Sequence, residues 1–370
     1  MQERSMAHIR AMQEAAEKGK LQINVTSTAG GRPIADARIS ISYTGVPESM
    51  LERVETDSSG QTETLELDAP PEAWSLDPSN ERQPYSEYTL DISAPGFEPV
   101  SIAGTEILAN VKAIQNVRMR PSDVGREEEE VFVIPAHTLY GEYPPKIAED
   151  EIKPVNETGE IVLSRVVVPE YIVVHDGSPR DTTATNYYVK YKDYIKNVAS
   201  SEIYATWPAN TIRANVLAIM SFTLNRVYTE WYRNRGYDFT ITSSTAFDHK
   251  WIPERNIYDT ISVIVDELFA DYLSRPNVRQ PILTQYCDGR RVTCPNWMTF
   301  LQQPTNARNP LNLLGLRLVV IIDFQLVRFF VIYDLLNHTL QNRVFRYSIH
   351  RIRIDNFIYI SHMFKQIFFN

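Results

Sequence analysis

The chain has 370 residues, of which 43% are apolar and 11% aromatic, and its formal net charge is −9. This length allows two domains, and this composition supports hydrophobic cores and excludes a disordered chain. Because the charge is negative and no basic cluster occurs before residue 300, nucleic acid is not expected as a partner.

The first 20 residues are polar and rich in alanine and glutamate, which predicts a surface helix. Charged residues occur within residues 1–10, where a secretory signal would need an apolar stretch. No export signal is therefore expected in this sequence.

Between residues 21 and 120, apolar and polar residues alternate in short runs separated by turn residues. These runs are residues 21–26, 37–43, 62–67, 85–93 and 113–119. Alternation with period two predicts strands, and this spacing is typical of an all-β sandwich. The order PIADA, TDSSG and APGF resembles the regulatory-like β-sandwich found beside carboxypeptidases. The resemblance implies a structural or adhesive module, through which a protein partner could bind.

Residues 121–180 are predicted to form a linker and an extended segment. Four consecutive glutamates at residues 127–130 repel one another and favour a solvated chain. From residue 131 to residue 180 the sequence is rich in proline and β-branched residues, which favours extended backbone.

Two later segments have the spacing of helices. Residues 211–226 place Ile212, Val216 and Ile219 on one face, and we expect this helix to end at Gly236. Residues 256–275 predict a second helix, and residues 280–286 predict a strand after it. The predicted fold class is therefore α+β, with an all-β sandwich followed by an α+β domain over residues 181–298.

One carboxylate, Glu202, stands just ahead of a Trp-Pro step and the first of these helices. The run YIKNVASSEI at residues 194–203, followed by Trp-Pro and by RAN at residues 213–215, resembles the core of the stage II sporulation protein D and amidase enhancer family. The resemblance extends from about residue 188 to residue 297. Sporulation members of that family are lytic transglycosylases, so the resemblance implies peptidoglycan glycan strands as the partner and a cell-envelope or spore-associated location.

The resemblance implies that Glu202 is the general acid, protonating the glycosidic oxygen between N-acetylmuramic acid and N-acetylglucosamine. The C6 hydroxyl of the sugar then attacks C1 and leaves a 1,6-anhydro end, so one protein carboxyl suffices. Such an acid must keep its proton near neutral pH, which apolar surroundings favour, and Tyr194, Tyr204 and Trp207 are expected to supply them. The predicted substrate-binding residues are Tyr204, Trp207, Arg213, Asn215, Ser243 and Ser244.

A second function is a wall-binding or scaffold protein that keeps the fold without turnover. It is favoured by Met220, which stands where members of the family commonly have an arginine.

The chain has two cysteines, Cys287 and Cys294, on either side of an Asp-Gly turn. They could form a disulfide, donate two metal ligands, or remain thiols. The acid mechanism requires no cofactor. Some members of the family hold zinc with one histidine and two cysteines, so the resemblance implies His249, Cys287 and Cys294 as a possible zinc set.

Residues 299–370 differ from the rest of the chain in composition. They hold three acidic and eight basic residues, nine of the fifteen phenylalanines and one glycine. We interpret them as a tail foreign to the family pattern, in which a frame change or divergence has replaced the native end. A transmembrane segment over residues 318–336 is disfavoured, because Asp323, Arg328 and Asp334 would each cost about 2.5–3.5 kcal/mol inside a bilayer.

Overall fold

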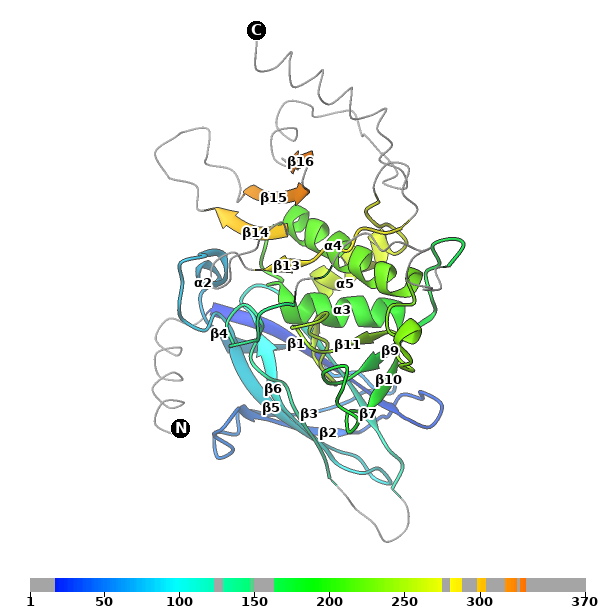
Figure 1. Ribbon diagram of the computed structural model, residues 1–370. Helices are drawn as coiled ribbons and strands as arrows, with labels where there is room; N and C mark the ends of the chain where they lie inside the picture. The colour runs from blue at the N-terminus through cyan, green and yellow to red at the C-terminus, as the bar shows by residue number, and fades with distance from the viewer. Residues whose placement is uncertain are drawn as a thin grey trace, which may run out of the picture. The chain divides into compact units, whose positions relative to one another are not determined.

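The computed structural model describes residues 17–122, 129–147, 149, 163–274, 280–287, 298–303, 317–324 and 327–330. It contains helices and several sheets, which confirms the predicted α+β class (Figure 1). The chain divides into two compact units that are not consecutive in sequence. The first comprises Met1–Pro144, Lys196–Ile212 and Lys250–Asp266, and the second Pro145–Ile195, Arg213–His249 and Glu267–Asn370.

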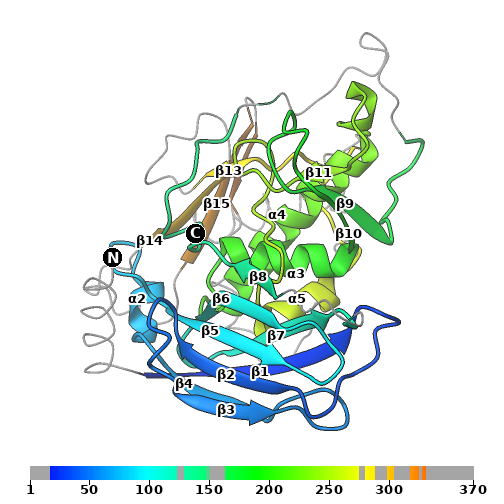
Figure 2. The same cartoon turned by 90° about the horizontal axis from the view of Figure 1, so that it is seen from below.

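Two sheets in the first unit form a sandwich-like arrangement (Figure 2). One has the order β12-β7-β1-β4, made of Ile257–Tyr258, Lys112–Met119, Glu17–Ser27 and Leu65–Ala69. The other has the order β3-β2-β5-β6-β8, made of Glu52–Glu55, Arg38–Tyr43, Ser86–Ser93, Val100–Ile107 and Glu130–Val133. A short helix, α2 (Glu72–Leu76), follows β4.

Side chains alternate between more and less buried along β1, β4, β5 and β7, as the period-two pattern predicts. In β1, for example, Leu21, Ile23 and Val25 are fully buried. In contrast, β3 is mostly exposed, and the last four residues of β6 are all buried. Strand β1 also begins earlier than expected. Residues 17–20, predicted as the end of a polar helix, pair with β4, with Glu17 opposite Ala69. Residues 1–16 of that predicted helix lie outside the described residues.

The later part of the first unit corrects the predicted helix over residues 256–275. Helix α5 covers Asp259–Leu268, while the two residues before it form β12. Ile257 and Tyr258 pair with Ile114 and Ala113 of β7, so these positions add a strand to the sandwich sheet. At these two positions, pairing with a distant strand outweighs the helical spacing of the apolar residues.

Helix α3 (Tyr191–Glu202) was not predicted, whereas α4 (Ala209–Tyr228) confirms and extends the helix predicted over residues 211–226. Side chains from Asn215 to Arg226 are all buried, so α4 is enclosed on every side and lacks the single apolar face expected for it. It ends at Tyr228, short of Gly236. That glycine, with φ of 82°, instead closes a 3₁₀ turn over Arg233–Arg235.

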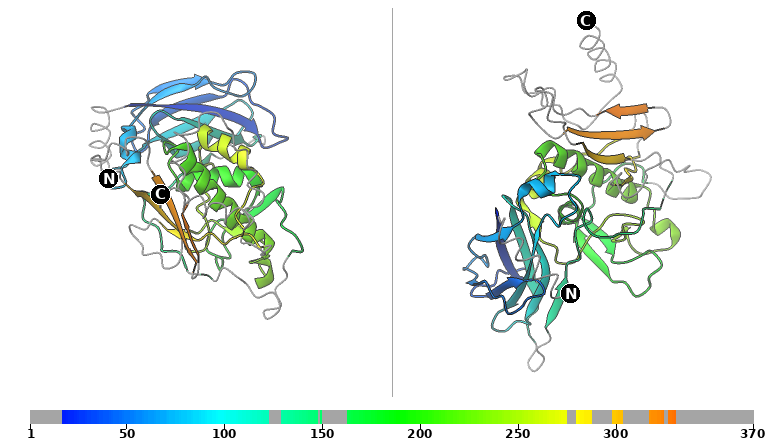
Figure 3. Two further views of the ribbon diagram at one scale, coloured as in Figure 1. Left: turned by 90° about the horizontal axis from the view of Figure 1, so that it is seen from above. Right: turned by 90° about the vertical axis from the view of Figure 1, so that its left-hand side faces the viewer.

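The second unit contains two further sheets. One has the order β10-β9-β11, made of Asn186–Lys190, Tyr171–His175 and Ile241–Thr242. The other joins β13 (Tyr286–Cys287), β14 (Met298–Gln303), β15 (Arg317–Phe324) and β16 (Val327–Phe330), and its last three strands are orange in Figure 3. Of the strand predicted over residues 280–286, only the end forms a regular strand. No helix within the described part of the chain meets the length and apolarity needed to span a membrane.

Candidate functional site

Glu202 is the last residue of α3, and its side chain faces inward. In the first half of α3 the residues Tyr191, Tyr194 and Ile195 are buried at helical spacing, and from Asn197 to Glu202 every residue is buried, with Glu202 8% exposed. The carboxylate Oε1 accepts the backbone N–H of Lys250 at 2.7 Å. A carboxylate is therefore held at the edge of a buried face, within the first unit.

Tyr204 and Trp207, which follow the acid in the sequence, contact each other and other residues of the first unit. The ring of Tyr204, which is 7% exposed, lies 4.5 Å from the ring of His137, and the ring of Trp207 meets it edge-on at 6.0 Å. The indole Nε1 of Trp207 donates to the backbone oxygen of Ser75 at 3.0 Å. Both rings are thereby fixed in place, and Trp207 keeps part of its surface exposed.

Tyr143, to which sequence reasoning assigned no role, lies in the first unit near Lys250. Burial raises its pKa to about 12, with further contributions from the carboxylates of Glu106 and Glu202. Its hydroxyl donates to the backbone oxygen of Ala136 at 2.5 Å, and the Lys250 ammonium lies 5.8 Å from its ring centre. Tyr143 is thus a neutral phenol in the electrostatic field of Glu202. The proline-rich segment around Tyr143 has no helical or strand periodicity from which a buried position could be predicted.

Two more carboxylates of the first unit lie opposite each other on adjacent strands, Glu87 on β5 and Glu106 on β6. Glu106 is fully buried and bound by both terminal nitrogens of Arg255, at 2.6 and 2.5 Å. Burial raises the pKa of Glu106, and the guanidinium opposes that effect. For Glu87, burial and then the charge of Glu106 raise the pKa to about 7. This pair therefore adds a proton-binding group to the unit that carries Glu202.

The remaining predicted substrate residues lie in the second unit and are engaged there. Arg213 forms an ion pair with Glu267. Asn215 is 1% exposed within α4, which leaves it no surface for a glycan. Ser243 donates its hydroxyl to Asp176 Oδ1 at 2.7 Å, and the backbone oxygen of Ser244 accepts the N–H of Asp248 at 2.8 Å.

His249, the predicted metal ligand, is fully buried. Its Nδ1 lies 3.3 Å from the hydroxyl of Tyr194, and its ring lies 4.5 Å from that of Phe222. Burial lowers its pKa well below the usual range, followed by the charges of Lys146 and Arg226. A neutral imidazole is the form that binds metals. The side chain of Cys287 and all of Cys294 lie outside the described residues, and no metal-binding group of three such ligands occurs among those described.

The loop after β11 is ordered by a buried arginine that sequence reasoning placed only in a helix. Arg226 donates to Asp248 Oδ1 and to Glu149 Oε1, both at 2.7 Å. The other oxygen of Asp248 accepts the hydroxyl of Tyr232 at 2.6 Å and that of Thr242 at 2.7 Å. The three guanidinium nitrogens of Arg226 all donate, the third to the backbone oxygen of Phe247 at 3.2 Å, and both oxygens of Asp248 accept, which indicates a structural role.

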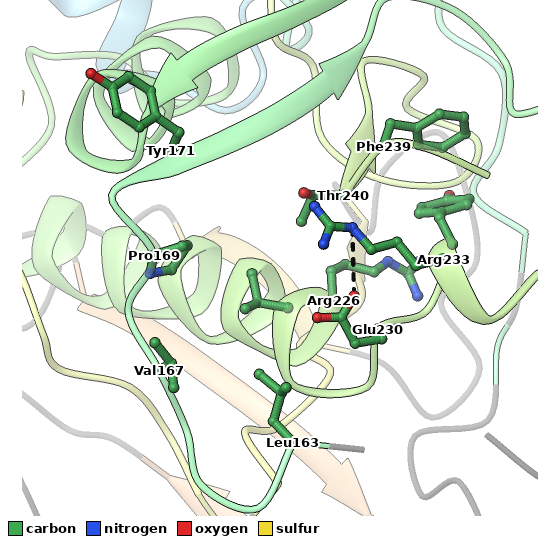
Figure 4. Close-up of a pocket in the computed structure, with 11 residues that line it drawn as sticks. Leu163, Val167, Pro169, Tyr171, Arg226, Glu230, Arg233, Phe239 and Thr240 are labelled. Atoms are coloured by element: carbon green, nitrogen blue, oxygen red, sulfur yellow. Dashed lines mark ion pairs between the residues drawn. The ribbon is translucent and has the colours of Figure 1, made fainter. Parts of the chain in front are cut away.

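A pocket of about 310 Å³ opens in the second unit beside the end of α4 (Figure 4). Its apolar wall includes Leu163, Val167, Pro169, Val227 and Phe239. The backbone N–H of Leu163 donates to the oxygen of Tyr228 at 3.0 Å, which fixes this wall to the helix end. Local sequence patterns do not predict the pocket, because its lining comes from segments up to about 75 residues apart.

No family model matches the chain, and no curated protein matches it. Solved structures that it matches in part include a minor pilin of Streptococcus agalactiae, with 12% identity, 30% of this chain and 48% of that chain covered, and a TM-score of 0.21. The 3-chlorocatechol 1,2-dioxygenase of Rhodococcus opacus 1CP matches with 12% identity and a TM-score of 0.21. This match covers 29% of this chain and 61% of that chain. The 5-hydroxyisourate hydrolase of Klebsiella pneumoniae matches with 16% identity and a TM-score of 0.20. This match covers 28% of this chain and 92% of that chain. The chain spans 48% and 61% of the lengths of the first two, and likenesses this low carry no inference about function.

Proposed function

We propose that this protein binds peptidoglycan glycan strands and cleaves them as a lytic transglycosylase, with Glu202 as the general acid. The observation that carries the proposal is the position of this carboxyl. It lies at the end of α3 with 8% exposure, followed at once by Tyr204 and Trp207, and Tyr143 lies within its field. A carboxyl that is largely shielded from water but still reachable is suited to donating a proton to a leaving oxygen.

In this mechanism Glu202 donates its proton to the glycosidic oxygen as the bond to C1 breaks. The C6 hydroxyl of the same N-acetylmuramic acid attacks C1 and loses its proton to the carboxylate that has just formed. The carboxyl is thereby regenerated, and the product is a 1,6-anhydro sugar. Trp207, which stays partly exposed, supplies an aromatic face for a sugar ring, because Ser75 fixes its indole.

A second candidate is a peptidoglycan-binding scaffold without turnover, and one observation favours it. The backbone N–H of Lys250 already occupies Oε1 of Glu202. A hydrogen bond from a backbone donor stabilises the ionised carboxylate, which is the wrong form for a general acid. On this alternative Glu202 joins the end of α3 to residues 250–266 of the first unit.

Replacing Glu202 by glutamine separates the two candidates, because it keeps the shape of the side chain and removes its acidity. Purified glycan strands would be incubated with the wild type, Glu202→Gln and the matched control Glu142→Gln, whose side chain is exposed. We expect Glu202→Gln to lower the yield of 1,6-anhydro ends, measured by mass spectrometry, about 100-fold or more. Glu142→Gln should match the wild type.

Binding is measured in the same samples by sedimentation with insoluble peptidoglycan, and we expect Glu202→Gln to sediment like the wild type. Equal yields of anhydro ends from wild type and Glu202→Gln would rule out Glu202 as the acid. Sedimentation without any product from the wild type would favour the scaffold, and absence of both would reject a peptidoglycan function.

A further inference from the structure

The pocket beside the end of α4 carries one charge of each sign. Glu230 and Arg233 both line it, and their ion pair spans 3.6 Å between the Glu230 carboxylate and Arg233 Nε. Figure 4 shows this pair on one side of the pocket, with Leu163, Val167 and Pro169 on the other. The Arg233 side chain is 54% exposed and that of Glu230 is 23% exposed, so the pair is hydrated and weak.

The backbone holds Glu230 in an unusual conformation. Its φ is 45°, in the left-handed region that residues other than glycine rarely adopt. Its N–H donates to the oxygen of Val227, and its own oxygen accepts the N–H of Asn234 at 2.8 Å. The residue therefore reverses the chain after α4 and presents its carboxylate to the pocket.

Arg226 also lines the pocket, but its guanidinium is engaged by Asp248 and Glu149. The charges available to a ligand are therefore those of Glu230 and Arg233, which sum to zero. A simple anion would face the repulsion of Glu230, and a simple cation that of Arg233. A ligand with one charge of each sign next to each other satisfies both.

We propose that this pocket binds a small zwitterion with an apolar body, namely an apolar α-amino acid. The ligand carboxylate pairs with Arg233 and its ammonium group with Glu230, so that two ion pairs replace one weak one. The ligand side chain packs against Leu163, Val227 and Phe239. A volume of about 310 Å³ is at the small end of the range for ligand pockets, which fits a ligand of this size. The inference does not depend on the role of Glu202.

Three probes test the two charge contacts separately. The full chain would be titrated with L-leucine, with L-leucinamide, which lacks the carboxylate, and with N-acetyl-L-leucine, which lacks the ammonium group. Binding is followed by ligand-observed nuclear magnetic resonance. We expect L-leucine to bind about tenfold or more tightly than either analogue, as a lost charge-assisted hydrogen bond predicts.

Substitutions then assign each contact. Arg233→Gln should remove the preference for L-leucine over leucinamide, and Glu230→Gln the preference over N-acetyl-leucine. The matched control Arg235→Gln should bind like the wild type, because that guanidinium lies 3.3 Å over the Trp231 ring. Val167→Trp, at a position 38% exposed, should fill the pocket and abolish binding without lowering the melting temperature.

Several results would overturn the proposal. They are the absence of saturable L-leucine binding, equal binding of the three probes to the wild type, unchanged preferences in Arg233→Gln and Glu230→Gln, and undiminished binding to a folded Val167→Trp. A variant that loses glycan cleavage but still binds L-leucine, or one that loses L-leucine binding but still cleaves glycan, would show that the pocket and the Glu202 site act independently.

Discussion

Among the residues that the structure describes, each unit buries one arginine, and the two units neutralise it differently. In the first unit Arg255 binds Glu106 through two parallel hydrogen bonds, and its Nη2 also donates to the oxygen of Ser200 at 2.7 Å. In the second unit Arg226 is shared between Asp248 and Glu149. A one-to-one pair is neutral when both partners are charged, whereas one guanidinium between two carboxylates leaves a net negative charge.

This difference determines how the stability of each unit responds to substitutions and to pH. Asp248 tolerates its charge because the hydroxyls of Tyr232 and Thr242 bond to its second oxygen. The Glu106–Arg255 pair instead has Glu87 beside it, a carboxyl whose pKa is raised to about 7. Loss of the cation should therefore destabilise both units, and the first unit should in addition respond to pH through Glu87.

The largest effect is expected for Arg226→Met, which leaves Asp248 and Glu149 without their cation. Removing one member of a buried ion pair typically costs about 3–5 kcal/mol. Urea unfolding followed by circular dichroism would measure the loss. The control Arg38→Met, at a side chain 80% exposed, should change stability by less than about 0.5 kcal/mol. A loss below about 1 kcal/mol for Arg226→Met would show that the network is not what holds this region together.

Removing both partners should distinguish the two networks. Arg255→Met alone should destabilise strongly, but Glu106→Leu combined with Arg255→Met should recover most of the loss, because no charge remains from the pair. Arg226→Met combined with Asp248→Asn should recover less, because Glu149 still loses the guanidinium that it binds. Equal recovery in the two double variants, measured by the same urea unfolding, would contradict the proposed contrast.

The smallest effect is expected for Glu87→Gln and depends on pH. Because the folded-state pKa of Glu87 is raised from 4.5 to about 7, the folded protein binds more protons than the unfolded chain between these values. The stability that Glu87 contributes is complete below pH 4.5 and is lost as the pH rises through about 7.

Glutamine stays neutral, so the stability of Glu87→Gln relative to the wild type should rise by about 1–2 kcal/mol from pH 4.5 to pH 8, after allowance for solvent screening. Melting temperatures of both proteins across this range would measure it. Parallel curves would exclude Glu87 as the titrating group.

Period two predicted five of the sandwich strands, for example β1, in which Leu21, Ile23 and Val25 are buried on one face. It did not predict β3, β6, β8 or β12. The helix over residues 211–226 was also predictable, although its complete enclosure was not. Apolar residues at helical spacing from Tyr191 to Ala199 indicate helix α3, but the burial of every residue from Asn197 to Glu202 does not follow from that spacing.

The contacts that define the Glu202 site were beyond local patterns. Tyr143 reaches the field of Glu202 from a segment without periodicity, and Lys250 donates to it across 48 positions. The predicted helix over residues 256–275 was wrong at its start for the same reason, because Ile257 and Tyr258 pair with β7.

Strand β12 has a consequence for how the chain folds during synthesis. The sheet that contains β7, at Lys112–Met119, gains its last strand only from Ile257–Tyr258, and Glu106 gains its cation only from Arg255. At about 5–20 residues per second, a ribosome needs roughly 7–28 seconds to make the intervening residues. For that time the emerging sandwich has an open sheet edge and a carboxylate without its cation. Long-range closure of this kind slows folding and favours holding by chaperones until residues 250–266 emerge.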